Sequence, residues 1–272
     1  MCYNHLLETF RGAMRNYICG SSGFIGTHLK QQLTDVVCIP HEKISKIKLK
    51  PFDNFFFLSS YGNLAGQTDE KEILKANVLD LISIIKQAIK FPFNSFVYFS
   101  SSSVKLPIQT MYSRCKRASE EILLAFIEKY HLPICIIRPY SVTGVGEQPQ
   151  HLIPTLIRAA IKNEEITLSS GTHDFIDVSD VCSGVLNLTK QGARGIYELG
   201  TGIKTTNEEV LALVEKVIGK KLKVKRVPQL RKYDNPDWVC NNFKARMFGW
   251  LPVKSLEQSI KDQYDTISKT SN

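Results

Sequence analysis

Short apolar runs alternate with segments of helical period along the first half of the chain. The apolar runs cover residues 16–20, 35–40, 54–60, 95–101 and 134–140, and the helical segments cover 23–33, 69–89 and 113–130. The runs are apolar throughout instead of alternating with polar residues, which is typical of parallel strands buried on both faces. We therefore predict a Rossmann-type α/β fold, in which helices cover both faces of a doubly wound parallel sheet.

The rhythm changes in the second half. Helical patterns at 151–165 and 205–219 are separated by a turn and helix at 174–188 and a short strand at 195–200, and Thr206 stands three residues before Glu209 as in a capping box. We predict a dinucleotide-binding domain over 14–147 and a smaller C-terminal substrate-binding lobe over 148–272, with 174–200 returning to the first sheet. Residues 1–13 have no clear partner in this fold, so we expect them to form an extension.

Composition restricts the class of protein. The chain is 43% hydrophobic and 22% charged, as in globular proteins. It lacks the run of about 20 apolar residues that spans a bilayer, and because its first fifteen residues include no continuous apolar stretch, we expect no secretory signal. The seven cysteines are scattered without CxxC or metal-ligand spacing. The lysines behind the net charge of +9 are dispersed. We expect a cytoplasmic protein with reduced thiols and no metal, nucleic-acid or membrane partner.

A glycine turn joins the first strand to the first helix. In GSSGFIG, Gly20 permits the tight turn, Gly23 allows the backbone to approach a pyrophosphate, and Gly26 allows the helix to pack closely on the strand. The N–H groups at the start of the helix would then face the phosphates. A glycine-rich turn alone is weak evidence, but its place in the first βα unit favours a dinucleotide site.

A serine block followed by a Tyr-Lys pair is the second candidate site. The stretch YFSSSSVKLPIQTMYSRCK ends a strand and opens a helix on which Tyr112 and Lys116 lie one turn apart. A phenol must be shifted down by about three pKa units, about 4 kcal/mol, to exchange protons near neutrality. A lysine cation and a nicotinamide cation could supply that shift. Ser101, or its neighbour Ser102, would hold the substrate oxygen.

Several ordered segments resemble one family. The GxxGxxG spacing, KANV (75–78), IIRPYSVTGVGEQ (136–148), HDFIDVSDV (173–181) and FGWLPVKSLEQSI (248–260) are similar to motifs of the extended short-chain dehydrogenases/reductases. These are NAD(P)-dependent epimerases, dehydratases and reductases of nucleotide sugars, and many of them serve polysaccharide biosynthesis. The resemblance runs from about residue 16 to about 265.

The resemblance implies roles for particular residues. Ser101, Tyr112 and Lys116 would be catalytic. Ser102, Ser141 and Arg231 would contact the substrate. The implied cofactor contacts are Gly20, Ser22, Gly23, Phe24, Ile25, Gly26, His41, Leu58, Ser59, Ser60, Tyr112, Lys116 and Pro139.

The chain also departs from the family. Ser102 and Ser103 replace the Asp-Glu pair of the dehydratases, so loss of water is not expected. The second strand ends without the acidic residue that binds the ribose hydroxyls in NAD enzymes. His41 and Lys43 stand there instead, so NADP is favoured over NAD. The 41–54 connection is barely long enough for one crossover.

We therefore expect hydride transfer at C4 of a nucleotide-linked sugar. Reduction of a 4-keto-6-deoxy sugar is favoured and 4-epimerisation is the alternative, because a short Ser-to-Tyr segment and a reduced crossover suggest that cofactor is exchanged at each cycle. A catalytically silent dinucleotide sensor is the remote third reading. The apolar helices at 70–89 and 113–129 predict a homodimer.

Overall fold

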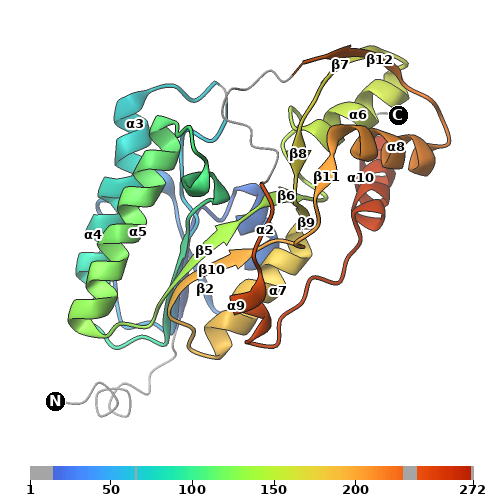
Figure 1. Cartoon of the computed structure of the whole chain (residues 1–272). Helices are drawn as coiled ribbons and strands as arrows, with labels where there is room; N and C mark the ends of the chain where they lie inside the picture. Colours follow the sequence, from blue (N-terminus) through green and yellow to red (C-terminus); the bar gives the residue numbers. More distant parts are fainter. Residues whose placement is uncertain (1–14, 65, 229–237, 271–272) are drawn as a thin grey trace. The chain divides into compact units, whose positions relative to one another are not determined.

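The computed structural model describes residues 15–64, 66–228 and 238–270 (Figure 1). The extension expected over residues 1–13 and the proposed substrate contact Arg231 lie outside the described residues. The chain divides into two compact units. Unit 1 contains Met1–Lys105, Gln109–Arg138 and Val185–Tyr197, and unit 2 contains Leu106–Ile108, Pro139–Gly184 and Glu198–Asn272. The change of unit after Arg138 comes earlier than the boundary at residue 147 that the sequence predicts.

Unit 1 is built on a six-stranded sheet of order β10-β5-β4-β3-β1-β2. The strands are β1 (Asn16–Cys19), β2 (Val36–Ile39), β3 (Asn54–Phe57), β4 (Ser95–Phe99), β5 (Ile134–Pro139) and β10 (Gly195–Leu199). The pairs β1–β2, β1–β3, β3–β4 and β4–β5 are all parallel. The predicted parallel sheet of a Rossmann-type fold is thus confirmed, and the strand order reverses at β1, where doubly wound sheets bind their ligands.

Both faces of this sheet are buried. On one face, Tyr17, Phe55 and Tyr98 pack in one hydrophobic cluster with helix α4 (Asp80–Ala88) and helix α5 (Met111–Tyr130). On the other face, Ile18 and Phe56 are also fully buried. Successive side chains of a strand point to opposite faces, so a strand covered on both sides has to be apolar at every position. This explains the unbroken apolar runs in the sequence.

The helical pattern at 69–89 folds as one run of three helical elements. Helix α3 (Glu70–Leu74) is followed directly by a π-helical turn, η2 (Lys75–Leu79), and then by α4. The Asp69 carboxylate caps α3 by accepting hydrogen bonds from the backbone N–H groups of Lys71 and Glu72. A π turn inside a helix is uncommon and is often found at a functional site; here it contains Asn77, which is fully buried.

The connection between β2 and β3 is reduced, as the sequence predicts. Its helical content is the single turn η1 (His41–Lys43). Two residues of this connection, Ile44 and Leu49, are buried, whereas the lysines between and around them are exposed. The segment from the serine block to α5 is also short, with one 3-10 turn, η3 (Ser102–Lys105), before α5 begins at Met111.

Unit 2 contains three two-stranded ladders and a helical cluster. β6 (Ser141–Thr143) pairs with β9 (Phe175–Asp177), β7 (Glu165–Ser169) with β12 (Lys223–Val227), and β8 (Thr172–His173) with β11 (Thr205–Thr206). Helices α6 (Leu152–Lys162), α8 (Asn207–Ile218) and α10 (Leu256–Thr270) share one hydrophobic cluster. The capping box predicted at Thr206 and Glu209 is present at the start of α8.

The remaining helices are α2 (Phe24–Lys30), α7 (Val178–Lys190) and α9 (Phe243–Arg246). Among the described residues, no helix has the length and apolar character needed to cross a membrane. The six cysteines in the described part of the chain are free thiols.

Candidate functional site

The glycine turn packs so closely against neighbouring backbone that two of its positions admit only glycine. Gly20 has φ +82°, and a Cβ on it would stand 2.8 Å from the backbone of Leu58 and Ser59. A Cβ on Gly26 would stand 2.0 Å from the Gly20 carbonyl oxygen. A side chain is therefore excluded at both positions. Gly23 is exposed and precedes α2 without a side-chain cap, so the start of this helix is placed where Rossmann-type folds bind a dinucleotide phosphate.

The other predicted cofactor contacts of unit 1 lie at the carboxyl ends of the neighbouring strands. Leu58, Ser59 and Ser60 follow β3, and His41 follows β2. The Leu58 N–H donates to the Cys19 carbonyl oxygen at the end of β1, at 2.9 Å. His41 Nδ1 lies 3.3 Å from Ser59 Oγ. The glycine turn and these residues therefore form one continuous edge of the sheet, and they fit a dinucleotide bound across the ends of β1, β2 and β3.

Ser101, Tyr112 and Lys116 come together in unit 1. Ser101 follows β4, and the other two lie one turn apart on α5. The N-cap of this helix is Thr110, whose side chain accepts a hydrogen bond from the Ser113 N–H. The hydroxyl of Ser101 hydrogen-bonds the Tyr112 phenol and also Ser103, at 2.9 Å. Ser102 is 3% exposed. Of the two serines, Ser101 is the one whose hydroxyl bonds the Tyr112 phenol.

The lysine of this group is held by the backbone. Lys116 is 1% exposed, and its Nζ donates to the Phe99 carbonyl oxygen at 2.8 Å. The ammonium lies 4.9 Å from the centroid of the Tyr98 ring and 5.8 Å from that of Tyr112. Burial lowers the pKa of Lys116 to about 7, whereas Glu120 and Cys115 oppose this shift. Burial therefore disfavours the charged form of this lysine, and the two neighbouring acidic groups favour it.

With only the protein's own residues around it, Tyr112 has a pKa far above the value needed for proton transfer near neutral pH. Burial raises the pKa of Tyr112 to about 12, although hydrogen bonds from Ser101 and Ser60 lower it. From the sequence we expect the Lys116 cation to lower this pKa. In the structure the net shift is upward, so the protein's own residues do not produce the expected lowering. A bound nicotinamide would add the positive charge that stabilises the phenolate.

Sequence reasoning missed the residues that fix α5 against its neighbours. Asn77, in the π turn, donates to the Tyr61 and Ile73 carbonyl oxygens at 2.7 and 2.8 Å. Ser119 Oγ donates to the Asn77 carbonyl oxygen at 2.7 Å. The Oδ1 atom of Asn77 is buried without a hydrogen-bond partner, which leaves it free to accept a bond from a bound ligand or water. The KANV motif was the signal that could have identified this residue.

A buried ion pair was also missed. Glu120 lies one turn after Lys116 and is 1% exposed. Arg138, at the end of β5, donates to both of its carboxylate oxygens, from Nε at 2.8 Å and from Nη2 at 2.5 Å. Arg138 belongs to the IIRPY segment and Glu120 follows the lysine by four residues, so the two motifs of the sequence meet in one bidentate pair.

Two predicted residues that the structure describes, Pro139 and Ser141, belong to unit 2. Pro139 ends β5, and Ser141 begins β6. Ser141 Oγ lies 3.3 Å from His173 Nδ1, and the His173 ring packs against Phe175 and Trp238. Arg231 lies outside the described residues.

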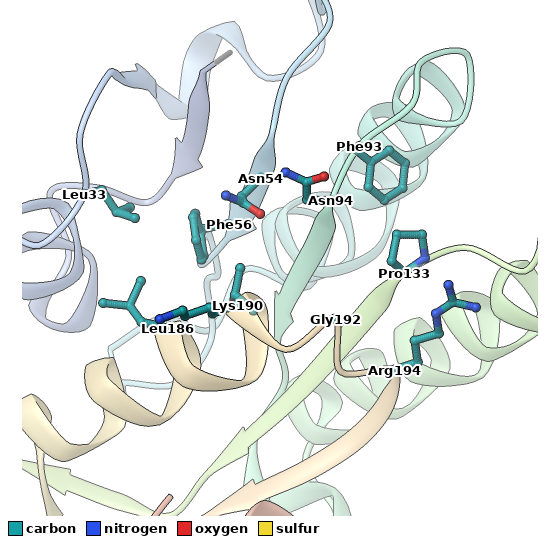
Figure 2. Close-up of a pocket in the computed structure, with 11 residues that line it drawn as sticks. Leu33, Asn54, Phe56, Phe93, Asn94, Pro133, Leu186, Lys190, Gly192 and Arg194 are labelled. Atoms are coloured by element: carbon teal, nitrogen blue, oxygen red, sulfur yellow. The ribbon is translucent and has the colours of Figure 1, made fainter. Parts of the chain in front are cut away.

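A cavity of about 610 Å³ in unit 1 lies at the opposite edge of the sheet (Figure 2). Its wall includes Asn54 at the start of β3, together with Asn94 and Pro133, which directly precede β4 and β5. Phe56, Leu33 and Leu186 line it as well. Because the candidate residues follow the carboxyl ends of the strands, this cavity is separate from the candidate active site.

The edge at the carboxyl ends of the strands carries the glycine turn together with Ser101, Tyr112 and Lys116. Such an arrangement is typical of Rossmann-type enzymes that transfer hydride. The sequence pattern of the NAD dependent epimerase/dehydratase family matches residues 60–200, more than half of the chain. The chain belongs to this family and is an NAD(P)-dependent enzyme of the extended short-chain dehydrogenase/reductase type that its sequence motifs resemble.

Relatives of different activity are similar to the chain. It is 27% identical to a UDP-glucose 4-epimerase of Rhizobium leguminosarum bv. trifolii, over 74% of this chain and 73% of that protein. It is 24% identical to a GDP-6-deoxy-D-mannose reductase of Pseudomonas aeruginosa, over 91% of this chain and 95% of that protein. The relatives include both epimerases and reductases, so the family is defined and the reaction is not.

Solved structures share the fold. The UDP-glucose 4-epimerase of Thermotoga maritima superposes with a TM-score of 0.86 at 20% identity, covering 95% of this chain and 100% of that one. The NADPH complex of RMD from Pseudomonas aeruginosa superposes with a TM-score of 0.82 at 20% identity and the same coverage.

Proposed function

We propose that this enzyme transfers hydride at C4 of a nucleotide-linked sugar, with Tyr112 as the proton donor and acceptor. The observation that carries the proposal is the group formed by Ser101, Tyr112 and Lys116, in which the Ser101 hydroxyl bonds the phenol and the lysine is buried beside the tyrosine ring. A carbonyl oxygen held by Ser101 would receive the phenol's proton as the carbonyl carbon gains hydride. The nicotinamide cofactor supplies that hydride.

The direction of the reaction that we favour is reduction of a 4-keto-6-deoxy sugar. An epimerase has to retain its keto intermediate and its cofactor while the sugar presents its other face. The only helical element in the described connection between β2 and β3 is the turn η1, and the segment between the serine block and α5 is short. Both features support a cofactor that enters and leaves at every cycle. Ser102, Ser141 and Arg231 are proposed to contact the substrate.

The reaction is tested by supplying 4-keto and 4-hydroxy nucleotide sugars and following NAD(P)H absorbance together with product mass. A reductase is expected to oxidise one NAD(P)H for each 4-keto sugar consumed, with a mass gain of two hydrogens in the sugar. Interconversion of C4 epimers without net oxidation, by protein purified with stoichiometric NAD, would instead establish the 4-epimerase. Hydride transfer with any sugar in the panel would exclude a silent sensor.

We also propose that the enzyme is a homodimer formed through α3, η2, α4 and α5. Their facing side chains pack in one cluster that includes Ile73, Val78 and Cys115, yet Leu74 and Leu79 on the same run remain 41% and 52% exposed. Exposed apolar residues of adjacent turns are typical of an interface.

Light scattering at micromolar concentration is expected to give the mass of two chains, and Leu79→Glu is expected to shift it towards one. Ile203→Glu is the control. Ile203 is an apolar side chain of unit 2 that is 64% exposed, and its replacement should leave the dimer intact. A wild-type monomer would contradict this prediction.

A further inference from the structure

A buried carboxylate lies against the ends of two strands that, in this class of fold, bind the adenosine half of the cofactor. Asp80, the first residue of α4, is 3% exposed. Burial raises the pKa of the Cys19 thiol at the end of β1, and the negative charge of Asp80 adds to the shift. Asp80 Oδ2 also lies 4.0 Å from His41 Nδ1, beyond the end of β2. Lys75 Nζ contacts the same oxygen at 3.2 Å.

The His41 ring has an acidic side chain near each of its nitrogens. Nδ1 faces Asp80 and the Ser59 hydroxyl. Nε2 lies 4.0 Å from Glu72 Oε2, and both of these side chains are 47% exposed. From the sequence, His41 is a candidate contact for the extra phosphate of NADP. In the structure its ring lies between two carboxylates, with one oxygen of each 4.0 Å from a ring nitrogen, and Glu72 is 47% exposed and accessible to a ligand.

The charges of the side chains around His41 oppose the 2′-phosphate that NADP carries in addition to the pyrophosphate. Apart from His41, Asp80 and Glu72 contribute two negative charges and Lys75 contributes one positive charge. A 2′-phosphate would bring about two more negative charges to this place, and like charges placed together cost several kcal/mol. A ribose 2′-hydroxyl, by contrast, can donate a hydrogen bond to a carboxylate oxygen. NAD enzymes use an acidic residue at the end of the second strand for this contact, and here helix residues stand near that strand end.

We propose that Glu72, supported by Asp80 and His41, selects NAD over NADP by accepting the ribose hydroxyl and repelling a 2′-phosphate. The acidic residue that is missing from the second strand is thus replaced by one from α3. This inference rests on the proposed function, because it assumes that the dinucleotide binds at these strand ends. It reverses the preference for NADP that His41 and Lys43 give in the sequence.

Calorimetric titration of the purified protein with NAD⁺ and NADP⁺ tests the inference without any sugar substrate. The wild type is expected to bind NAD⁺ about tenfold more tightly or better. Glu72→Gln should reduce that ratio severalfold, and Glu72→Lys should bring it to one or below. Glu70→Gln is the matched control, since Glu70 is exposed two residues earlier on α3, and it should leave the ratio unchanged.

The outcomes separate this inference from the proposed function. Tighter binding of NADP⁺ by the wild type, or equal changes of the ratio in the Glu70 and Glu72 variants, would overturn the cofactor selection and leave hydride transfer standing. Binding of neither dinucleotide would overturn the proposed function and this inference with it. A circular dichroism spectrum and melting curve of each variant confirm that altered binding does not come from unfolding.

Discussion

Replacing Tyr112 by phenylalanine is expected to lower turnover by about 10²- to 10⁴-fold, the range that a positioned acid/base group contributes. The substitution removes one hydroxyl and keeps the ring, which packs with Ile73, Val78 and Cys115. Dinucleotide affinity is therefore expected to stay within a few-fold of the wild type. Retention of more than a tenth of the turnover would contradict the assigned role.

Tyr130→Phe is the matched control for this experiment. Tyr130 ends the same helix, α5, and is 42% exposed, so loss of its hydroxyl should leave turnover unchanged. Cofactor titration of both variants separates loss of chemistry from loss of binding. In the Tyr112 variant, the bond from Ser101 to the phenol is also lost, and a double variant with Ser101→Ala should lose little more activity than Tyr112→Phe alone.

The sheet and most of its helices were predictable because local and tertiary preferences agree in them. Strands such as β3 and β4 are apolar at nearly every position, and both faces of the sheet bury them. The capping box of α8 was readable because its two partners are three residues apart. The π turn at Lys75–Leu79 was not, since its sequence is that of an ordinary helix and the turn is fixed by contacts of Asn77 with Tyr61 and Ser119.

The candidate site was only partly predictable for the same reason. Gly20, Gly23 and Gly26 form a local motif, as do Tyr112 and Lys116 on one helix. The acidic side chains beside His41 are Glu72 of α3 and Asp80 of α4, which lie far from His41 along the chain. No spacing in the sequence indicates that they approach His41. The pKa of the tyrosine also depends on burial, a property of the folded chain that a motif cannot supply.

Arg138→Met is expected to lower the free energy of unfolding by about 3–5 kcal/mol, the cost of leaving one member of a buried ion pair without its partner. Glu120 is 1% exposed, and Arg138 donates both of the hydrogen bonds that the structure shows to its carboxylate. Without the guanidinium, this carboxylate stays buried beside Lys116 and loses both of these hydrogen bonds. Urea unfolding at pH 7, followed by circular dichroism, measures the loss.

Two further variants show whether the loss comes from the unpaired charge. Arg226→Met removes the arginine of the Arg226–Glu208 pair, whose side chains are 62% and 53% exposed, and should change the stability little because solvent screens that pair. The double variant Glu120→Met with Arg138→Met should recover part of the stability, since replacing both partners by apolar side chains leaves no charge buried. A double variant as unstable as Arg138→Met alone would mean that lost packing, and not the stranded carboxylate, causes the effect.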